Sequence, residues 1–201
     1  MNKKLKILII IMYIFIVFVT LILIKHILTP VRKPAIYLYP TEDKIVSVKL
    51  YVNGVIIKST PNYKNEWRVF VTKDGIIENK YDYLFYEALL KNIILPREGW
   101  VVEYSALEKW FDENLIKLGL NEKEKDQFKE YWLRELPKSN YYEIKLLEDS
   151  FINKNMKLVI NPKPNTLIRL HFYFKPLKEK INIKEPKVIT PERNGFVVVE
   201  W

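Results

Sequence analysis

The run FVVVEW, from Phe196 to Trp201, is the stretch of sequence that decides the fold. Its first four residues are all apolar, without the alternation of a strand that has one side in water. A strand that is covered on both faces reads instead as a continuous apolar run. The sequence therefore predicts that residues 196–201 form a central strand of a sheet and are buried on both faces.

Further segments rich in β-branched and aromatic residues supply the neighbours that such a strand needs. Residues 81–90, YDYLFYEALL, are compatible with either a strand or a helix, and their aromatic side chains favour a strand in the first half. The other predicted strands are Ala35–Tyr39, Val46–Val52, Val55–Lys58, Trp67–Val71, Glu98–Tyr104, Tyr142–Leu147, Met156–Ile160, Leu167–Phe174 and Val188–Ile189.

The clearest local signal is a β-hairpin over residues 46–58. Residues 46–52 alternate apolar and polar side chains, and residues 55–58 provide a return strand. Asn53 and Gly54 between them form the favoured dipeptide of a type I′ turn, in which both central residues have positive φ. The sequence therefore predicts that the two flanking strands pair with each other.

The period changes to that of helices after residue 104. Ser105 and Glu108 have the spacing of a capping box, and apolar residues then recur every three or four positions until Gly119. Asn121 and Glu124 repeat the capping pattern before a second helix. The link between the helices is very short, so the sequence predicts an antiparallel αα-hairpin inserted among strands. The expected fold class is α+β, with a mainly antiparallel sheet or sandwich.

The first part of the chain has a different composition. Residues 7–24 contain no charged side chain, and at ~1.5 Å per residue a helix of this length spans ~27 Å, close to a bilayer core. A small-residue cleavage site and a cysteine for lipidation are both missing. The sequence predicts an uncleaved signal-anchor over residues 1–28, with a single transmembrane helix at about 7–24. A short stalk over residues 29–34 and one extracytoplasmic domain over 35–201 follow.

This anchor gives an expected location and a first partner. A short lysine-bearing N-terminal tail stays in the cytoplasm more easily than a large domain does. We therefore expect a single-pass protein of the cell membrane, with residues 30–201 outside the cytoplasm. The lipid bilayer is then a partner through the N-terminal helix, and an envelope polymer or a membrane protein is a possible second one.

Charge and composition exclude several classes of function. The chain has 33 lysine and arginine residues against 24 aspartate and glutamate residues, and after residue 28 the two signs are interspersed. No concentrated basic stripe of the kind that nucleic-acid binding needs is visible. The absence of cysteine excludes disulfides and thiolate metal sites, and two histidines without a paired spacing predict no metal. No glycine-rich phosphate loop occurs, so no cofactor is expected.

Three polar residues form the candidate binding group. In LIRLHFYF, Arg169, His171 and Tyr173 alternate with apolar residues, so a strand would place all three on one face. That face is either a solvent-exposed side of a sheet or a binding site.

Two carboxylates form the candidate catalytic group. Glu87 follows YLFY and Glu103 follows GWVV, so each lies in an aromatic and partly apolar context that suits a general acid. Two such acids are the catalytic pair of a glycosidase if they stand roughly 5–10 Å apart. In the structural alternative, Glu87 pairs with Arg169 inside the fold and the aromatic residues belong to the core.

Five segments in order carry a resemblance to a known family: KPAIYLYP, YDYLFYEA, YWLREL, NPKPNTLIRLHF and PERNGFVVVEW. Together they resemble a family of prokaryotic surface or secreted proteins of unknown function, over essentially residues 33–201. Members of that family often carry a signal or lipid anchor before the first segment. The resemblance implies no catalytic residue.

Three hypotheses of function follow. The first is a surface-tethered binding or interaction module, with Arg169, His171 and Tyr173 on its binding face. The second is a carboxylate hydrolase acting on envelope glycans, with Glu87 and Glu103 in one cleft. The third is a scaffold subunit of a membrane complex, which predicts an exposed apolar patch on the helical hairpin over residues 107–136. The first is the favoured interpretation.

Overall fold

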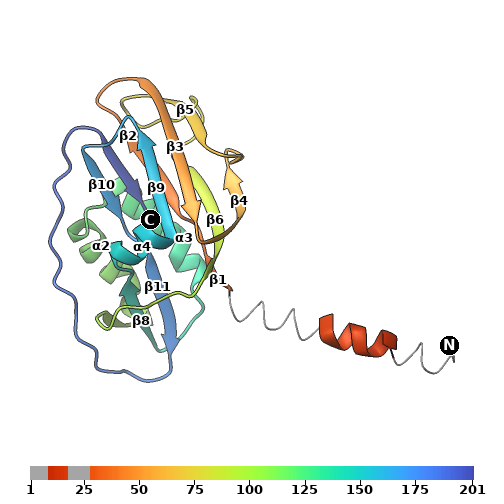
Figure 1. The fold of residues 1–201 in the computed structure, drawn as a ribbon. Coiled ribbons are helices and arrows are strands. Elements are labelled where there is room, and N and C mark those ends of the chain that lie inside the picture. The colour runs from red at the N-terminus through yellow and green to blue at the C-terminus, as the bar shows by residue number, and fades with distance from the viewer. Residues whose placement is uncertain (1–8, 18–27) are drawn as a thin grey trace.

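The computed structural model describes residues 9–17 and 28–201 (Figure 1). Residues 28–201 form an α+β fold of mainly antiparallel strands, as the sequence predicted. In chain order the elements are β1 (Leu28–Val31), β2 (Ala35–Tyr39), β3 (Lys44–Val52), β4 (Gly54–Thr60), β5 (Trp67–Val71), β6 (Leu84–Lys91), β7 (Trp100–Glu103), η1 (Tyr104–Ala106), α2 (Leu107–Lys117), α3 (Glu122–Glu135), β8 (Tyr141–Leu146), α4 (Asp149–Asn155), β9 (Met156–Asn161), β10 (Thr166–Arg169), β11 (Phe172–Leu177) and β12 (Val197–Glu200).

The structure corrects the predicted membrane helix. Within the residues that it describes, no helix is both long and apolar enough to cross a membrane. Residues 9–17, which are the described residues in the first part of the chain, are helical, and a spanning helix needs about 20 apolar residues. The transmembrane helix, the signal-anchor and the single-pass location in the cell membrane are therefore wrong as predictions. Residues 7–8 and 18–24 of the predicted span lie outside the described residues.

The predicted stalk is also corrected, because its first part belongs to the fold. Strand β1 pairs antiparallel with β6, with Thr29 opposite Leu90 and Val31 opposite Ala88. Residues 28–31 therefore belong to the same sheet as residues 35–39.

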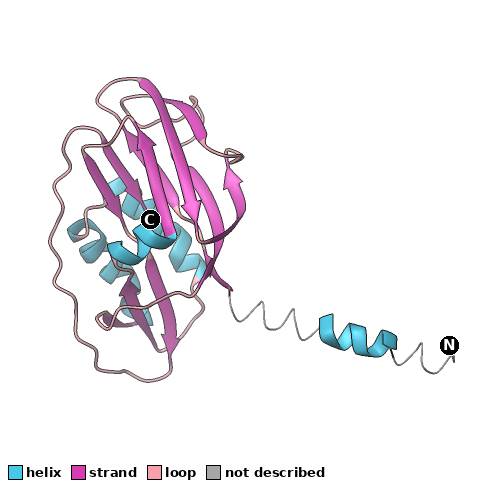
Figure 2. Cartoon of the chain, in the orientation of Figure 1, coloured by secondary structure: helices cyan, strands magenta, loops and turns pink. Residues whose placement is uncertain are grey.

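A central sheet organises the fold (Figure 2). Its strand order is β1-β6-β2-β12-β10, and β4 also pairs with β6. The pair β10 and β12 is parallel, whereas β12 and β2 are antiparallel. All four residues of β12 are buried, so the prediction of a central strand covered on both faces is confirmed.

The two faces of the central sheet pack against different layers. Leu38, Tyr86 and Val198 on one face join the core that contains the sheet β5-β3-β9. Tyr37 and Val199 on the other face join a core built with α2, α3 and the sheet β11-β8-β7. Alternate residues of one strand thus enter two separate cores, as the period of two in a strand requires.

The predicted hairpin at Asn53 and Gly54 is wrong, although both of its strands exist. Strand β3 pairs with β5 and β9, while β4 pairs with β6 in the central sheet. Neither Asn53 nor Gly54 has the positive φ that a type I′ turn needs. A Cβ atom on Gly54 would lie 1.8 Å from the backbone oxygen of Leu89. The glycine is therefore required by a close approach of two backbones, at the point where the chain crosses between sheets.

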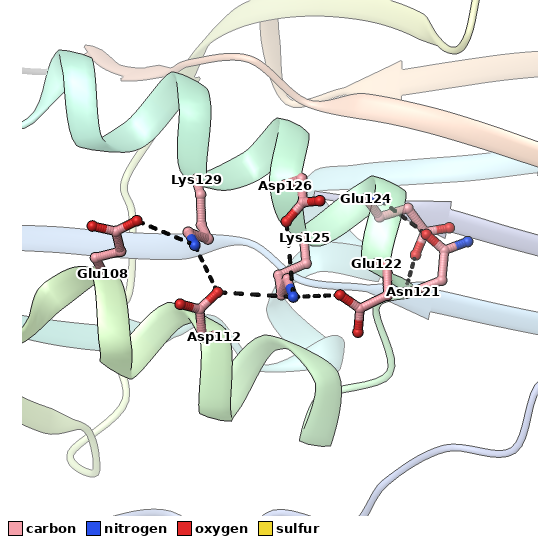
Figure 3. A network of polar contacts seen from close by, with 8 residues as sticks. All are labelled: Glu108, Asp112, Asn121, Glu122, Glu124, Lys125, Asp126 and Lys129. Atoms are coloured by element: carbon pink, nitrogen blue, oxygen red, sulfur yellow. Dashed lines mark hydrogen bonds and ion pairs between the residues drawn. The ribbon is translucent and has the colours of Figure 1, made fainter.

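The helical hairpin of α2 and α3 is confirmed, with one of its two caps. The side chain of Asn121 accepts a hydrogen bond from the backbone N–H of Glu124, and the Glu124 side chain accepts one from the backbone of Asn121. Ser105 instead lies in η1, and Ala106 precedes α2 without a side-chain cap. Charged side chains of α2 and α3 meet between the two helices (Figure 3), and we call this set the hairpin ladder: Glu108, Asp112, Glu122, Lys125, Asp126 and Lys129.

The predicted strand over residues 167–174 is two strands in different sheets. Strand β10 ends at Arg169, β11 begins at Phe172, and the two residues between them belong to neither. Helix α4 was not predicted, and residues 188–189 form no strand. The break at residues 170–171 decides where the candidate binding residues lie.

Candidate functional site

A buried polar cluster lies at the end of β12, around the carboxylate of Glu200, which has no exposed surface. Its Oε1 accepts a hydrogen bond from the hydroxyl of Tyr86 at 2.8 Å. Its Oε2 accepts one from Nε of Arg169 at 2.5 Å and lies 2.9 Å from Nε2 of His171. Three side chains from two separate parts of the sequence thus converge on one carboxylate.

Strand pairing positions this cluster. Arg169 lies directly opposite Glu200 in the parallel pair β10 and β12. The backbone N–H of Leu170 then donates to the backbone oxygen of Glu200 at 2.7 Å, and that of Leu147 donates to the oxygen of His171 at 2.8 Å. His171 is therefore held by backbone contacts on both sides of the break between β10 and β11.

The rest of the Arg169 guanidinium is bound at the junction of α4 and β9. Its Nη2 donates to the backbone oxygen of Met156 at 2.7 Å, and its Nη1 donates to Oδ1 of Asn153 at 3.3 Å. Buried arginines are rare unless their charge is paired and their donors are used. Arg169 meets both conditions, which fixes the position of Glu200 as well.

The charges of the cluster keep each other ionised. Burial alone would raise the pKa of Glu200, but the guanidinium of Arg169 and the contact with His171 outweigh it and hold that pKa well below its ordinary range. Burial alone would lower the pKa of Arg169, and the carboxylate of Glu200 raises it instead. Burial and the same carboxylate raise the pKa of Tyr86 well above its ordinary value. Glu200 and Arg169 are therefore a permanent buried ion pair near neutral pH.

The prediction that Arg169, His171 and Tyr173 share one polar face of a strand is wrong. Arg169 and His171 are 7% and 5% exposed, and only Tyr173 keeps part of its side chain in solvent. The alternation predicted from one continuous strand stops at residues 170–171, where the chain changes sheets. Arg169 and His171 are brought together by Glu200 rather than by a shared strand face.

A cavity of about 270 Å³, here called the aromatic cavity, lies beside the cluster. His171 and Tyr173 line it, together with the C-terminal end of α3 and residues 29–32. Arg169 does not line it. The aromatic residues of its wall are Phe128, Trp132, Phe172, Phe174 and Trp201.

His171 and Trp201, which both line this cavity, each have one ring nitrogen without a hydrogen bond in the described residues. His171 uses Nε2 for Glu200, and its Nδ1 makes no hydrogen bond within the described part of the chain. Trp201 is 3% exposed, and its Nε1–H has no partner among residues 9–17 and 28–201. A buried N–H without an acceptor costs about 1–3 kcal/mol.

The structure does not bring the candidate catalytic carboxylates together. Glu87 lies on β6 in the central sheet, and Glu103 ends β7 in the sheet β11-β8-β7. Glu87 lines a surface groove whose described wall does not include Glu103. Nor does Glu87 pair with Arg169, since that arginine is bound to Glu200. No group of three or more His, Asp or Glu side chains in the described residues is placed to hold a metal ion.

Sequence reasoning missed Glu200, Tyr86 and Trp201. A usable signal was present, because a glutamate inside a strand predicted to be buried on both faces needs a positive partner. The basic residues of LIRLHF were the available partners. The cluster draws on three of the five segments that carry the resemblance: YDYLFYEA, NPKPNTLIRLHF and PERNGFVVVEW.

Comparisons with known proteins give one partial relative. The chain is 44% identical over 61 residues to a protein of Butyrivibrio fibrisolvens named "Uncharacterized protein in bglA 3'region". The match covers 27% of this chain and 64% of that protein. No family model matches the chain, and no solved structure matches it.

Proposed function

We propose that this protein is a binding domain and that the aromatic cavity is its ligand site. The observation that carries the proposal is an aromatic wall that also contains His171 and Trp201, each with a ring nitrogen that makes no hydrogen bond among residues 9–17 and 28–201. Ligand sites in proteins are mostly apolar concavities with a few placed polar groups. The cavity meets this description with residues that the fold already holds in position.

The size and lining of the cavity narrow the ligand. Its volume of about 270 Å³ lies just below the usual range of about 300–1,000 Å³ for small-molecule sites. A compact apolar or aromatic group fits such a space, either as a small molecule or as one end of a larger one. Nδ1 of His171, which makes no hydrogen bond in the described residues, favours a ligand that carries a polar group.

The buried cluster supports the site by fixing His171. The imidazole is held at Nε2 by Glu200, which is itself held by Arg169 and Tyr86. A binding group that is already fixed loses little conformational entropy when the ligand arrives. The cluster thus preorganises one polar contact of the cavity.

The other two hypotheses have weaker support. A glycosidase needs two carboxylates in one cleft, and Glu87 and Glu103 belong to different sheets. A scaffold predicts an exposed apolar patch on the hairpin, but its main apolar residues lie inside the core. These buried residues are Leu107, Phe111, Leu115, Phe128 and Leu136.

The test is a calorimetric titration of the full chain with indole, p-cresol and cyclohexanone as small probes. The variant Trp132→Leu removes one aromatic wall of the cavity and should weaken probe binding by about tenfold or more. Trp110→Leu is the matched control, because Trp110 is also a partly buried helical tryptophan of the same core but does not line the cavity.

The control should bind each probe with an affinity close to that of the unmodified chain. The proposal fails if none of the three probes binds saturably to the unmodified chain. It also fails if the two leucine variants lose affinity to the same extent.

A further inference from the structure

A second concave surface, here called the cationic groove, lies where β4, β6 and α3 meet the start of β2. Its volume is about 640 Å³, and its cationic residues are Lys33, Lys58, Lys80 and Arg134. It is distinct from the aromatic cavity, although both include Glu135 in their walls.

Aromatic rings hold the three lysines of the groove. The ammonium of Lys33 lies 4.9 Å from the ring centre of Tyr131 and 5.3 Å from that of Tyr83. Lys58 lies 5.4 Å from the ring centre of Phe85, which Lys33 also contacts at 5.8 Å. Lys80 lies 5.1 Å from the ring centre of Tyr81. Distances below about 6 Å are those of cation–π contacts, which keep a cation in place without neutralising its charge.

No carboxylate of the described residues forms an ion pair with the three lysines of the groove, Lys33, Lys58 and Lys80. Three acids also line the groove. Asp82 pairs with Lys123 at 2.6 Å and Glu135 with Arg134 at 3.4 Å, whereas Glu87 forms no ion pair within the described residues. The groove therefore keeps an excess of positive charge, since its three lysines stand against the single carboxylate of Glu87.

The backbone places Lys33 in this groove at some cost. Its φ is +54°, a left-handed conformation that lysine rarely adopts. Strained residues of this kind concentrate at functional sites, where the surrounding structure holds them. Lys33, Tyr83 and Tyr131 come from three of the segments that carry the resemblance, KPAIYLYP, YDYLFYEA and YWLREL.

We propose that the cationic groove is a second binding site, for an acidic polymer that carries several carboxylate or phosphate groups. Three fixed ammonium groups without acidic partners match several anionic groups better than a single one. The rings already face lysine ammonium groups, so the ligand meets positive charge rather than free aromatic faces. This argues against recognition by base stacking, which needs such faces to be open.

The test measures binding of two polymers to the full chain at low ionic strength. Polygalacturonate supplies carboxylates and inorganic polyphosphate supplies phosphates. The variant Lys33→Gln/Lys58→Gln/Lys80→Gln should lose about tenfold or more in affinity for the bound polymer. The polymer that binds the unmodified chain more tightly identifies the anionic group.

The matched control removes the same charge elsewhere. Lys154→Gln/Lys157→Gln/Lys163→Gln changes three exposed lysines that line neither the groove nor the aromatic cavity. It should lose less than about threefold, because only the long-range attraction to the net charge is reduced. If the groove variant does not fold, Lys58→Gln/Lys80→Gln replaces it, since both side chains are exposed.

Two results would overturn the proposal. One is that neither polymer binds the unmodified chain, and the other is that the groove and control variants lose the same affinity. The aromatic cavity is not altered by these variants, so either result leaves the proposed function in place.

Discussion

The chain carries two networks of charged side chains, and they differ in the solvent around them. The hairpin ladder joins Lys129 to Asp112 at 2.6 Å, and the side chain of Asp112 is 42% exposed (Figure 3). The buried cluster joins Arg169 to Glu200 at 2.5 Å, with 4% and 0% of the side chains exposed. Similar distances therefore carry different free energies, because water screens the first pair and not the second.

This difference also separates the roles of the two networks. The ladder lies between two helices that already pack through Phe111 and Phe128. The cluster is different, because removing either Arg169 or Glu200 would leave the other charge unpaired inside the core. The cluster should be intolerant of single changes, and the ladder should be tolerant.

The largest expected effect is that of Glu200→Gln. Removing one partner of a buried ion pair costs about 3–5 kcal/mol, because the charge of Arg169 stays behind. The measurement is urea unfolding at neutral pH. Glu103→Gln, the same chemical change at an exposed position, should shift the unfolding free energy by no more than about 0.5 kcal/mol. Equal effects of the two variants would contradict the assigned role of the cluster.

The second largest expected effect is the loss of the stabilisation by Glu200 at low pH. The folded-state pKa of Glu200 lies below its ordinary value of 4.5, so its ionised form stabilises the fold fully above that value. This contribution is lost as the pH falls from 4.5 towards the folded-state pKa. Urea unfolding at about pH 7 and about pH 3 should therefore show a smaller acid loss in Glu200→Gln than in the unmodified chain. An identical acid loss in both proteins would count against the buried ion pair.

A change at Glu124 on α3 should lower the stability by less than a change in the buried cluster and by more than a change in the hairpin ladder. Its carboxylate has no exposed surface and accepts two hydrogen bonds of 2.9 Å from the guanidinium of Arg193. Glu124→Gln should cost roughly 2 kcal/mol, the scale of a charged hydrogen bond with one partner partly in solvent. Glu122→Gln on the same helix is the control, since that side chain is 76% exposed. Thermal unfolding of both variants checks the order.

The smallest effect is expected at the ladder. Asp112→Asn should lower the unfolding free energy by less than about 1 kcal/mol, and the loss should shrink further at high salt. Chemical unfolding at low and high ionic strength measures both. A loss as large as that of Glu200→Gln would remove the contrast between the two networks.

Patterns that depend on neighbouring residues could be read from the sequence. The period of the helical hairpin, the cap at Asn121 and the apolar run of β12 all follow from local rules. The pairing of strands does not, as Gly54 illustrates. Its dipeptide has the composition of a turn, but its backbone contacts residues 89–90, which lie far along the chain.

The same limit applied to the candidate site. Arg169 and His171 were found as candidates, but their burial depends on a change of sheet at residues 170–171 that their alternation does not reveal. The partners Tyr86 and Glu200 lie 114 residues apart in the sequence. Only the order of strands in the central sheet brings them together.

The most direct test of the ligand site is an NMR titration that follows the side-chain indole N–H signals of the five tryptophans. Saturating the chain with one of the small probes should shift the signals of Trp132 and Trp201, which line the aromatic cavity. The signal of Trp67, which belongs to the core on the opposite face of the central sheet, should stay in place. Unchanged signals of Trp132 and Trp201 with every probe, or equal shifts of all five, would contradict the account.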